Sequence, residues 1–284
     1  MKIPLNAPHR NYRDENHKPE LICALRPFWA LKGFREIGSI ITLMDKIGPV
    51  AHSVGVDILR NQPNEEGLKS FLNSLMTMER EQQRNVVTEV VACGEKYSET
   101  DPVFEWLTKL NREYPGDIGV LSPIFLNVIH LQPGEATFIP SGELHAYLEG
   151  AGLELMANSD NVLRGGLTSK HIDIPELLES LNFTCNGVNI LTPERQVTGE
   201  RVYPTLAEEF MLSMISLHEG SFYRSPEIRS VEILICTEGA GRIIEHGSRD
   251  GLDLSNGTVI IIPAAVRQYR IEGDATLYKA SVPL

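Results

Sequence analysis

The sequence predicts a mainly β protein with a block of α-helices inserted near its start. Short β-prone runs separated by Gly, Asn and Asp fill the second half of the chain, whereas helical periodicity is confined to about residues 36–114. A Gly-x5-Pro frame at residues 134–140 is followed by a weaker copy at residues 257–263. Its recurrence in two β regions indicates two related barrels. The alternative is a chance repeat, because loops are rich in both residues.

Two β-prone segments, residues 21–25 and 28–34, precede the helical block. Inside the block, the apolar residues of the first predicted helix recur at i, i+3, i+4, i+7 and i+8 and therefore share one face; they are Leu68, Phe71, Leu72, Leu75 and Met76. Asn64, which is followed by two glutamates, suits the N-cap of that helix. Residues 86–91 and 104–110 predict two further helices.

Strands and turns are expected from residue 118 to about 155, followed by a short helix over residues 174–181. Short strands then continue to the C-terminus and include two at residues 231–236 and 241–245, with residues 238–241 as a hairpin turn between them. We therefore expect a first barrel from residues 1–35 and 116–188, a helical insertion at 36–115, and a second, degenerate barrel at 189–284.

The composition limits the function classes. A net charge of −12, from 38 acidic and 26 basic residues, disfavours binding to bulk nucleic acid or to an anionic membrane surface. The four cysteines are scattered, without a Cys-x-x-Cys pair, which is typical of reduced thiols. No signal-peptide pattern and no apolar run of about 20 residues is present, so we expect a soluble, cytoplasmic protein.

The most informative run extends from Gly134 to Tyr147. Pro140 and Gly142 suit a tight turn between two strands, and alternation after the turn points His145 and Tyr147 to one face. The spacing Gly-x5-Pro-x-Gly-x2-His resembles the second metal-binding motif of cupin barrels, so His145 is a candidate metal ligand in a jelly roll. In the second copy of the frame, Gln268 stands at the histidine position.

Two other polar runs are candidates for the same site. In Asn16-His17-Lys18-Pro19-Glu20, alternation places Lys18 and Glu20 on one side of an extended segment, where they could enter one cavity. The glycine-rich run at residues 158–170 carries Arg164 and Lys170, which suit phosphate or sugar oxygens. The alternatives are a solvated polar turn and an ordinary surface loop. No Walker A, Gly-x-Gly-x-x-Gly or Gly-x-Ser-x-Gly motif is present.

Together these runs resemble type I phosphomannose isomerase, a cupin family. The resemblance covers almost the whole chain and rests on Asn16-His17-Lys18-Pro19-Glu20, Gly33-Phe34-Arg35, His145-Ala146-Tyr147-Leu148 and residues 156–164 (Met-Ala-Asn-Ser-Asp-Asn-Val-Leu-Arg). It implies a zinc enzyme that interconverts mannose 6-phosphate and fructose 6-phosphate through a cis-enediol. Such a reaction needs a base and an electrophile that holds the developing oxyanion.

The resemblance also implies a role for each site residue. Glu20 and His145 would be zinc ligands, and Arg164 would stabilise the enediolate. The remaining assignments are Asp160 and Glu154 as proton-transfer groups, Lys18 and Tyr147 as substrate-binding residues, and Lys170 close to the substrate. A small sugar phosphate is the expected partner, with no nucleic acid or membrane.

Two departures from the family pattern stand out. Ser169 occupies a position where the family usually has proline. Family members also carry a Gln-x-His pair, which supplies two further zinc ligands, before the Asn-His-Lys-Pro-Glu run; here 15 residues precede Asn16 and the chain contains no Gln-x-His. We therefore expect a member that lacks its N-terminal portion and binds zinc weakly. The alternatives are a non-catalytic sugar-phosphate-binding cupin and a truncated product with no separate role.

Overall fold

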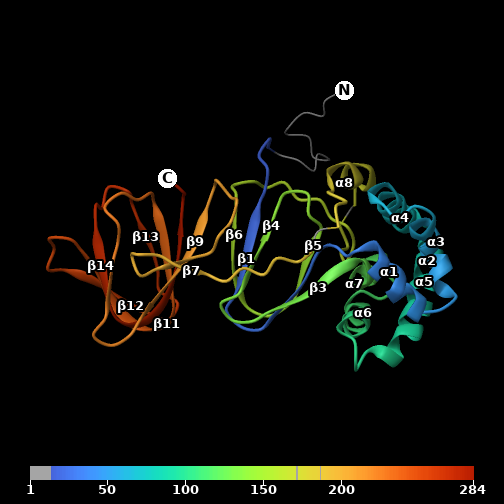
Figure 1. The fold of residues 1–284 in the computed structure, drawn as a ribbon, viewed down its shortest axis with the longest axis horizontal. Helices are drawn as coiled ribbons and strands as arrows, with labels where there is room; N and C mark the ends of the chain where they lie inside the picture. Colours follow the sequence, from blue (N-terminus) through green and yellow to red (C-terminus); the bar gives the residue numbers. More distant parts are fainter. Residues whose placement is uncertain (1–13, 171, 186) are drawn as a thin grey trace.

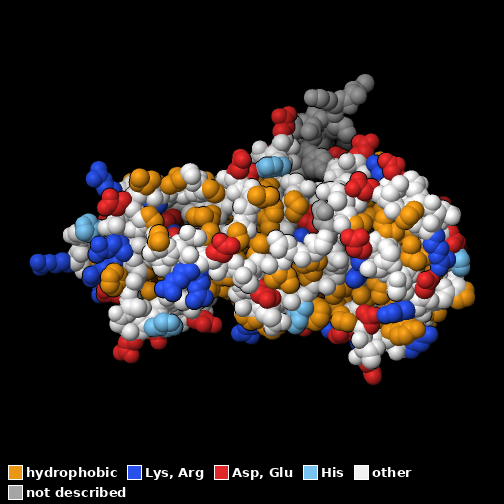
Figure 2. Space-filling view, viewed as in Figure 1, with side chains coloured by type: hydrophobic (Ala, Val, Ile, Leu, Met, Phe, Trp, Pro, Cys, Tyr) orange, Lys and Arg blue, Asp and Glu red, His pale blue; other side chains and the backbone are white. Residues whose placement is uncertain are grey.

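The computed structural model describes residues 14–170, 172–185 and 187–284. The molecule is elongated, with helices at one end, the C-terminal strands at the other, and two small sheets between them (Figure 1). In Figure 2, acidic side chains are spread along the visible face, and several Lys and Arg side chains gather over the C-terminal strands. None of the helices in the described part of the chain is both long and apolar enough to span a bilayer.

The two small sheets are antiparallel and have three strands each. One has the order β4-β1-β6 and consists of β1 (Glu20–Ala24), β4 (Ala136–Ile139) and β6 (Gly152–Met156). The other has the order β3-β2-β5 and consists of β2 (Phe28–Phe34), β3 (Leu126–Leu131) and β5 (His145–Glu149). Apolar residues of both sheets form one shared cluster: Ile22, Ala24, Phe28, Ala30, Ile129, Leu131 and Ile139. The sheets therefore face each other.

The helical block packs on the outer side of the second sheet. Its helices are α1 (Ile37–Lys46), α2 (Val50–Val54), α3 (Val56–Asn61), α4 (Glu65–Thr77), α5 (Arg80–Gly94), α6 (Pro102–Glu113) and α7 (Ser122–Phe125), with 3₁₀ turns at Glu95–Tyr97 and Ile118–Leu121. As predicted, the Asn64 side chain caps α4 by accepting a 3.0 Å hydrogen bond from the Gly67 N–H. Ala146 and Leu148 of β5 pack against the helical core, on the face opposite His145.

The prediction of strands from residue 118 onward was wrong for the first eight positions. Residues 118–125 form a 3₁₀ turn and α7, and the strand begins only at Leu126. Asp117 caps the turn, because its carboxylate accepts a 2.7 Å hydrogen bond from the Gly119 N–H, and Pro123 suits the first turn of α7. Local capping overrides the β-prone residues between them.

The C-terminal region forms an eight-stranded sheet, joined to the central sheets by a connection that includes α8 (Ile174–Ser180). Its strands are β7 (Glu194–Arg195), β8 (Arg201–Val202), β9 (Met211–Leu217), β10 (Phe222–Arg224), β11 (Glu232–Glu245), β12 (Gly251–Ser255), β13 (Val259–Ile262) and β14 (Tyr269–Ser281). The outer side of β1 packs against this region, since Leu21 and Cys23 share a core with Tyr203, Leu212 and Tyr278.

The predicted hairpin turn at residues 238–241 does not form. One strand, β11, runs through this stretch with a register shift between Cys236 and Glu238. Gly239 has φ +75°, and a Cβ there would lie 2.1 Å from the Asp274 carbonyl oxygen of β14. The glycine therefore permits a bulge and a close strand approach rather than a turn.

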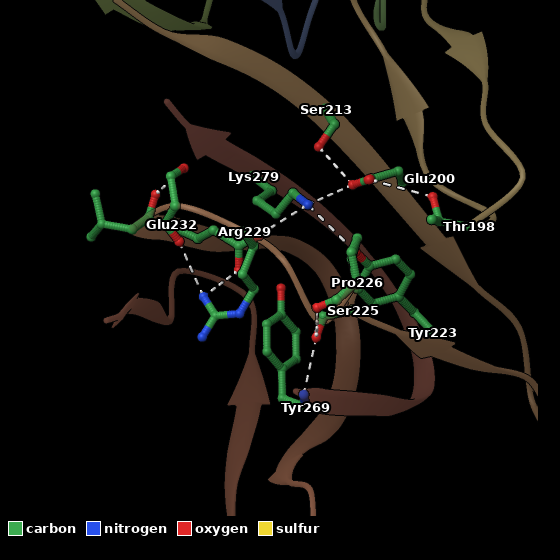
Figure 3. A network of polar contacts seen from close by, with 12 residues as sticks. Thr198, Glu200, Ser213, Tyr223, Ser225, Pro226, Arg229, Glu232, Tyr269 and Lys279 are labelled. Atoms are coloured by element: carbon green, nitrogen blue, oxygen red, sulfur yellow. Dashed lines mark hydrogen bonds and ion pairs between the residues drawn. The ribbon is translucent and has the colours of Figure 1, made fainter. Parts of the chain in front are cut away.

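A buried ionic network lies in the C-terminal sheet (Figure 3). The Lys279 ammonium is 2.6 Å from Glu200 Oε2 and 3.2 Å from Glu232 Oε1, and Arg229 Nη1 is 3.1 Å from Glu232 Oε2. All four residues are at least nine-tenths buried. The two carboxylates are thus paired with two cations, as buried charges require.

Candidate metal centre and active site

Glu20 and His145 meet between the two central sheets. Glu20 begins β1 and pairs with Ile139 and Met156, while His145 begins β5 opposite Lys32 of β2. Glu20 Oε2 lies 3.3 Å from His145 Nε2. Each residue thus occupies an inward position of its strand, so the pairing of the strands brings the two side chains together.

A backbone carbonyl orients the His145 ring. The Nδ1 atom lies 2.9 Å from the Glu143 carbonyl oxygen, which can only accept, so Nδ1 carries the hydrogen. Burial alone would lower the pKa of His145, but the hydrogen bonds to Glu20 and to the Glu143 carbonyl raise it above its ordinary value. The arrangement directs Nε2 toward Glu20.

Glu20 is held as a carboxylate by its neighbours. Burial alone would raise its pKa, but the hydrogen bond and charge of His145 and the ammonium of Lys18, 3.2 Å from Oε1, lower the pKa to about 2. Lys18 and Glu20 enter one cavity, as the alternation of their segment predicted. At neutral pH the site therefore presents an ionised carboxylate beside an ammonium and an imidazole.

Tyr147 and Glu154 form a second pair next to the first. The Tyr147 hydroxyl donates a 2.7 Å hydrogen bond to Glu154 Oε1, and its ring centroid is 5.7 Å from that of His145. Glu154 pairs with Ile22 across β1 and β6, which puts it on the same face as Glu20. Burial and the contact with Glu154 raise the pKa of Tyr147, so its hydroxyl remains a donor.

A cavity of about 760 Å³ opens beside Glu20 and His145. Its polar lining includes Asn16, Lys18, Ser141 and Glu143, and the Ser141 hydroxyl accepts a 2.8 Å hydrogen bond from the Lys18 N–H. Sequence reasoning missed Ser141 and Glu143 as site residues. Their position inside the run from Gly134 to Tyr147 was the signal that could have revealed them.

Five predicted site residues lie outside the lining of this cavity, and two of them, Tyr147 and Glu154, stay next to His145. Arg164 is half-buried in the loop after β6, and Asp160 is exposed, its backbone N–H donating to Asp14 at 3.1 Å. Lys170 lines a separate cavity of about 740 Å³ together with Arg80 and Arg84. The structure therefore brings Lys18, Glu20 and His145 to one cavity wall and places Tyr147 and Glu154 next to His145. Arg164, Asp160 and Lys170 lie outside this lining.

The Glu20–His145 pair suits zinc in its donor chemistry. Zinc binds imidazole nitrogen and carboxylate oxygen, and the anchored Nδ1 of His145 is typical of a metal-binding histidine. Among the described residues, no group of three or more His, Cys, Asp or Glu side chains is arranged to hold a metal ion. The residues thus fit zinc in kind and supply two protein donors.

Comparisons with known proteins point to one family. Residues 1–37 match the family model "Phosphomannose isomerase type I, catalytic domain", and residues 50–126 match "Phosphomannose isomerase type I, helical insertion domain". The chain is 37% identical to the mannose-6-phosphate isomerase of Escherichia coli over 97% of its own length and 68% of that protein. It is 39% identical to the enzyme of Salmonella typhimurium over 84% of its own length and 59% of that protein.

Solved structures agree. A crystal structure of the Salmonella typhimurium isomerase "bound to substrate (f6p) and metal atom (zn)" superposes with a TM-score of 0.86 at 33% identity, over 99% of this chain and 70% of that one. A zinc-bound mannose 6-phosphate isomerase gives the same TM-score, identity and coverage. With this identity and coverage, the chain belongs to the type I phosphomannose isomerase family of enzymes.

Proposed function

We propose that this chain is a zinc-dependent aldose–ketose isomerase that interconverts mannose 6-phosphate and fructose 6-phosphate through a cis-enediol. The observation that carries the proposal is the convergence of Glu20 Oε2 and His145 Nε2, 3.3 Å apart, beside a cavity that also holds Lys18. The similar structure with bound fructose 6-phosphate and zinc supports the same substrate class.

Glu20 and His145 would hold the zinc ion. When bound, zinc would polarise a sugar carbonyl or hydroxyl oxygen and so stabilise the charge that develops there. Protein zinc sites normally use three or four protein ligands. With two donors from the described residues, we expect weaker binding than in a complete site.

Lys18 in the cavity and the neighbouring Tyr147–Glu154 pair would bind the sugar and move the proton. The Lys18 ammonium would hold a substrate oxygen, and Tyr147 would donate to Glu154 while that carboxylate takes part in the C1–C2 proton transfer. Arg164 would stabilise the enediolate, with Asp160 as a second candidate acid–base group and Lys170 as a contact for the phosphate. These last three assignments rest on the family motif.

We also propose that the two central sheets are one cupin-like barrel and the C-terminal sheet a second, degenerate one. The support is their strand pairing: Ile139 and Ile262, each directly before the proline of a Gly-x5-Pro frame, pair with Glu20 and Glu232. The proposed boundaries stay at residues 1–35 and 116–188, 36–115, and 189–284.

A second candidate function is sugar-phosphate binding without catalysis. It is favoured by one observation, namely that Lys170 lines a separate cavity with Arg80 and Arg84, away from the Glu20–His145 pair. Such a cavity could hold a phosphate group without presenting the sugar carbon atoms to a base.

The deciding experiment is the conversion of mannose 6-phosphate to fructose 6-phosphate by the purified chain with zinc supplied, compared with an Arg164→Ala variant. Zinc-dependent turnover that the variant loses would support the isomerase. If neither protein turns over substrate but the wild type binds mannose 6-phosphate in calorimetry, the non-catalytic alternative holds. The absence of both turnover and binding would contradict both proposals.

A further inference from the structure

The loop after β6 carries two of the residues that the family motif assigns to the reaction, Asp160 and Arg164. The described residues 157–170 form neither helix nor strand. The Ala157 N–H still donates to the Pro19 carbonyl at 3.1 Å, and the backbone then leaves the sheet. The Arg164 guanidinium forms no ion pair or hydrogen bond with the residues that the structure describes. Its position therefore depends on what holds the loop backbone.

The Asp14 carboxylate holds the start of this loop. Its Oδ2 atom accepts a 3.1 Å hydrogen bond from the Asp160 N–H, and the Ser159 hydroxyl donates to its Oδ1 atom at 3.0 Å. Oδ1 also accepts from the Asn161 side-chain amide at 3.1 Å and from the Asn16 N–H at 2.9 Å. One carboxylate thus joins two segments that lie 145 residues apart in the chain.

Both oxygens of Asp14 are needed as acceptors. Burial alone would raise the pKa of Asp14, but the hydrogen bonds from Asn16, Asp160, Ser159 and Asn161 hold the pKa below its ordinary value. The group is therefore an ionised carboxylate at neutral pH. An amide at this position would turn one of the two oxygens into a donor that faces other donors.

Asp117 holds the end of the loop. Its Oδ1 atom accepts a 3.1 Å hydrogen bond from the Leu167 N–H and a 2.7 Å hydrogen bond from the Gly119 N–H. Leu167 has φ +52°, the only positive φ of a non-glycine residue in the described part of the chain. A Cβ on Gly166 would lie 2.9 Å from the Gly119 Cα, so the loop approaches the 3₁₀ turn closely. A strained backbone of this kind persists only where its surroundings fix it.

We propose that Asp14 and Asp117 are positioning residues that hold residues 159–167 at both ends and so fix the place of Arg164 beside the cavity. Residues 161–163 line that cavity, so loss of either anchor would move its wall as well. The inference rests on the proposed function for the role of Arg164. The anchoring of the loop is a property of the chain without substrate or zinc.

The first test is hydrogen–deuterium exchange of the zinc-free chain, measured by mass spectrometry with fragmentation to single residues. We expect Asp14→Asn to speed the exchange of the Asp160 amide by about 10–100-fold, because hydrogen bonds to charged groups stabilise the closed state by such factors. Asp117→Ala should have the same effect on the Leu167 amide.

Two conservative variants separate this anchoring from general destabilisation. Asp117→Asn keeps an oxygen at Oδ1, the atom that accepts both hydrogen bonds, and should retain wild-type exchange in the loop. Asp57→Asn is the matched control for Asp14→Asn, since the Asp57 carboxylate contacts His52 and Arg60 on the helical block. It should also leave the loop unchanged.

The second test is turnover of mannose 6-phosphate with zinc supplied. Asp14→Asn and Asp117→Ala should lower kcat by about 10–100-fold with little change in KM, because a displaced Arg164 loses contacts that form only as the enediolate develops. Asp117→Asn and Asp57→Asn should keep the wild-type kcat.

Wild-type loop exchange in a folded Asp14→Asn or Asp117→Ala protein would overturn the proposal, and so would faster exchange with an unchanged kcat. If Asp14→Asn does not fold, Ser159→Ala takes its place, because it removes the hydroxyl that donates to Asp14; it must speed the exchange of the Asp160 amide, or the proposal fails. A wild type without turnover, whose variants still show faster loop exchange, would contradict the proposed function while supporting the anchoring of the loop.

Discussion

Glu232 occupies in the C-terminal sheet the position that Glu20 occupies in the central sheets. Glu20 pairs with Ile139 on one side and Met156 on the other, and Glu232 pairs with Ile262 and Ser281. The charges around the two carboxylates differ. Glu20 faces Lys18 and His145, whereas Glu232 faces Arg229 and Lys279.

In the same comparison, Lys279 takes the place of Glu154. Glu154 pairs with Ile22, two residues after Glu20, and Lys279 pairs with Leu234, two residues after Glu232. Burial would lower the pKa of Lys279, but Tyr223, Glu200 and Glu232 raise it to about 12. The Lys279 ammonium thus compensates the Glu232 carboxylate, whereas His145 contacts the Glu20 carboxylate in the central sheets (Figure 3).

Lys279→Met should strongly destabilise the chain. The substitution leaves Glu200 and Glu232 buried without their shared cation, and breaking a buried pair typically costs about 3–5 kcal/mol. Urea unfolding followed by circular dichroism would measure the free energy of unfolding. Arg270→Met, on the same strand but with an exposed partner, Glu272, should cost less than about 1 kcal/mol. Equal losses would contradict this account of the network.

The Glu20 carboxylate should make stability depend on pH in the acid range. Its pKa in the folded chain, about 2, lies below the ordinary 4.5, so its ion pairs stabilise the fold above 4.5 and this stabilisation is lost as the pH falls toward about 2. For the zinc-free chain, the urea midpoint of the wild type should exceed that of Glu20→Gln at pH 6 and converge with it near pH 2. If the urea midpoints of the wild type and Glu20→Gln differ by the same amount at every pH, the ion pairs of Glu20 do not cause the difference.

Gly33→Ala should cost more stability than Gly48→Ala. Both glycines have positive φ, +58° and +71°. Because alanine is strained in this left-handed conformation, each substitution should cost about 1–2 kcal/mol. Only at Gly33 would the new Cβ approach another group, lying 2.5 Å from Glu143 Oε1, whereas nothing lies within 4 Å at Gly48. The extra cost should disappear in a Glu143→Ala background. If it persists there, the contact with the Glu143 side chain is not its source.

Tyr147→Phe should lower kcat/KM by about 10–100-fold if the chain is the proposed isomerase. The variant removes the 2.7 Å hydrogen bond to Glu154, and hydrogen bonds to charged groups contribute about 1.5–3 kcal/mol. Steady-state kinetics at saturating zinc would measure the loss. Because Tyr147 is 38% exposed, thermal unfolding should change little. Wild-type kinetics in the variant would remove the Tyr147–Glu154 pair from the mechanism.

Local signals were sufficient for much of the fold. Asn64 caps α4 as predicted, the three main helices of the block occur at α4, α5 and α6, and β2 spans Phe28–Phe34. Such features depend on capping groups and periodicity within a few residues. The error at residues 118–125 arose because a cap overrides β propensity. The error at residues 238–241 arose because this stretch pairs with a distant strand, β14.

The sequence by itself determined the family motifs, the helix caps and the alternation that sends Lys18, Glu20, His145 and Tyr147 inward, because these depend on residue type and short-range spacing. Only the tertiary structure decided which atoms meet. The 3.3 Å contact of Glu20 with His145, the 3.1 Å ion pair of Lys32 with Glu143 and the separation of Lys170 from both pairs follow from strand register across segments far apart in the chain. Register is set by the packing of whole sheets, which no local pattern contains.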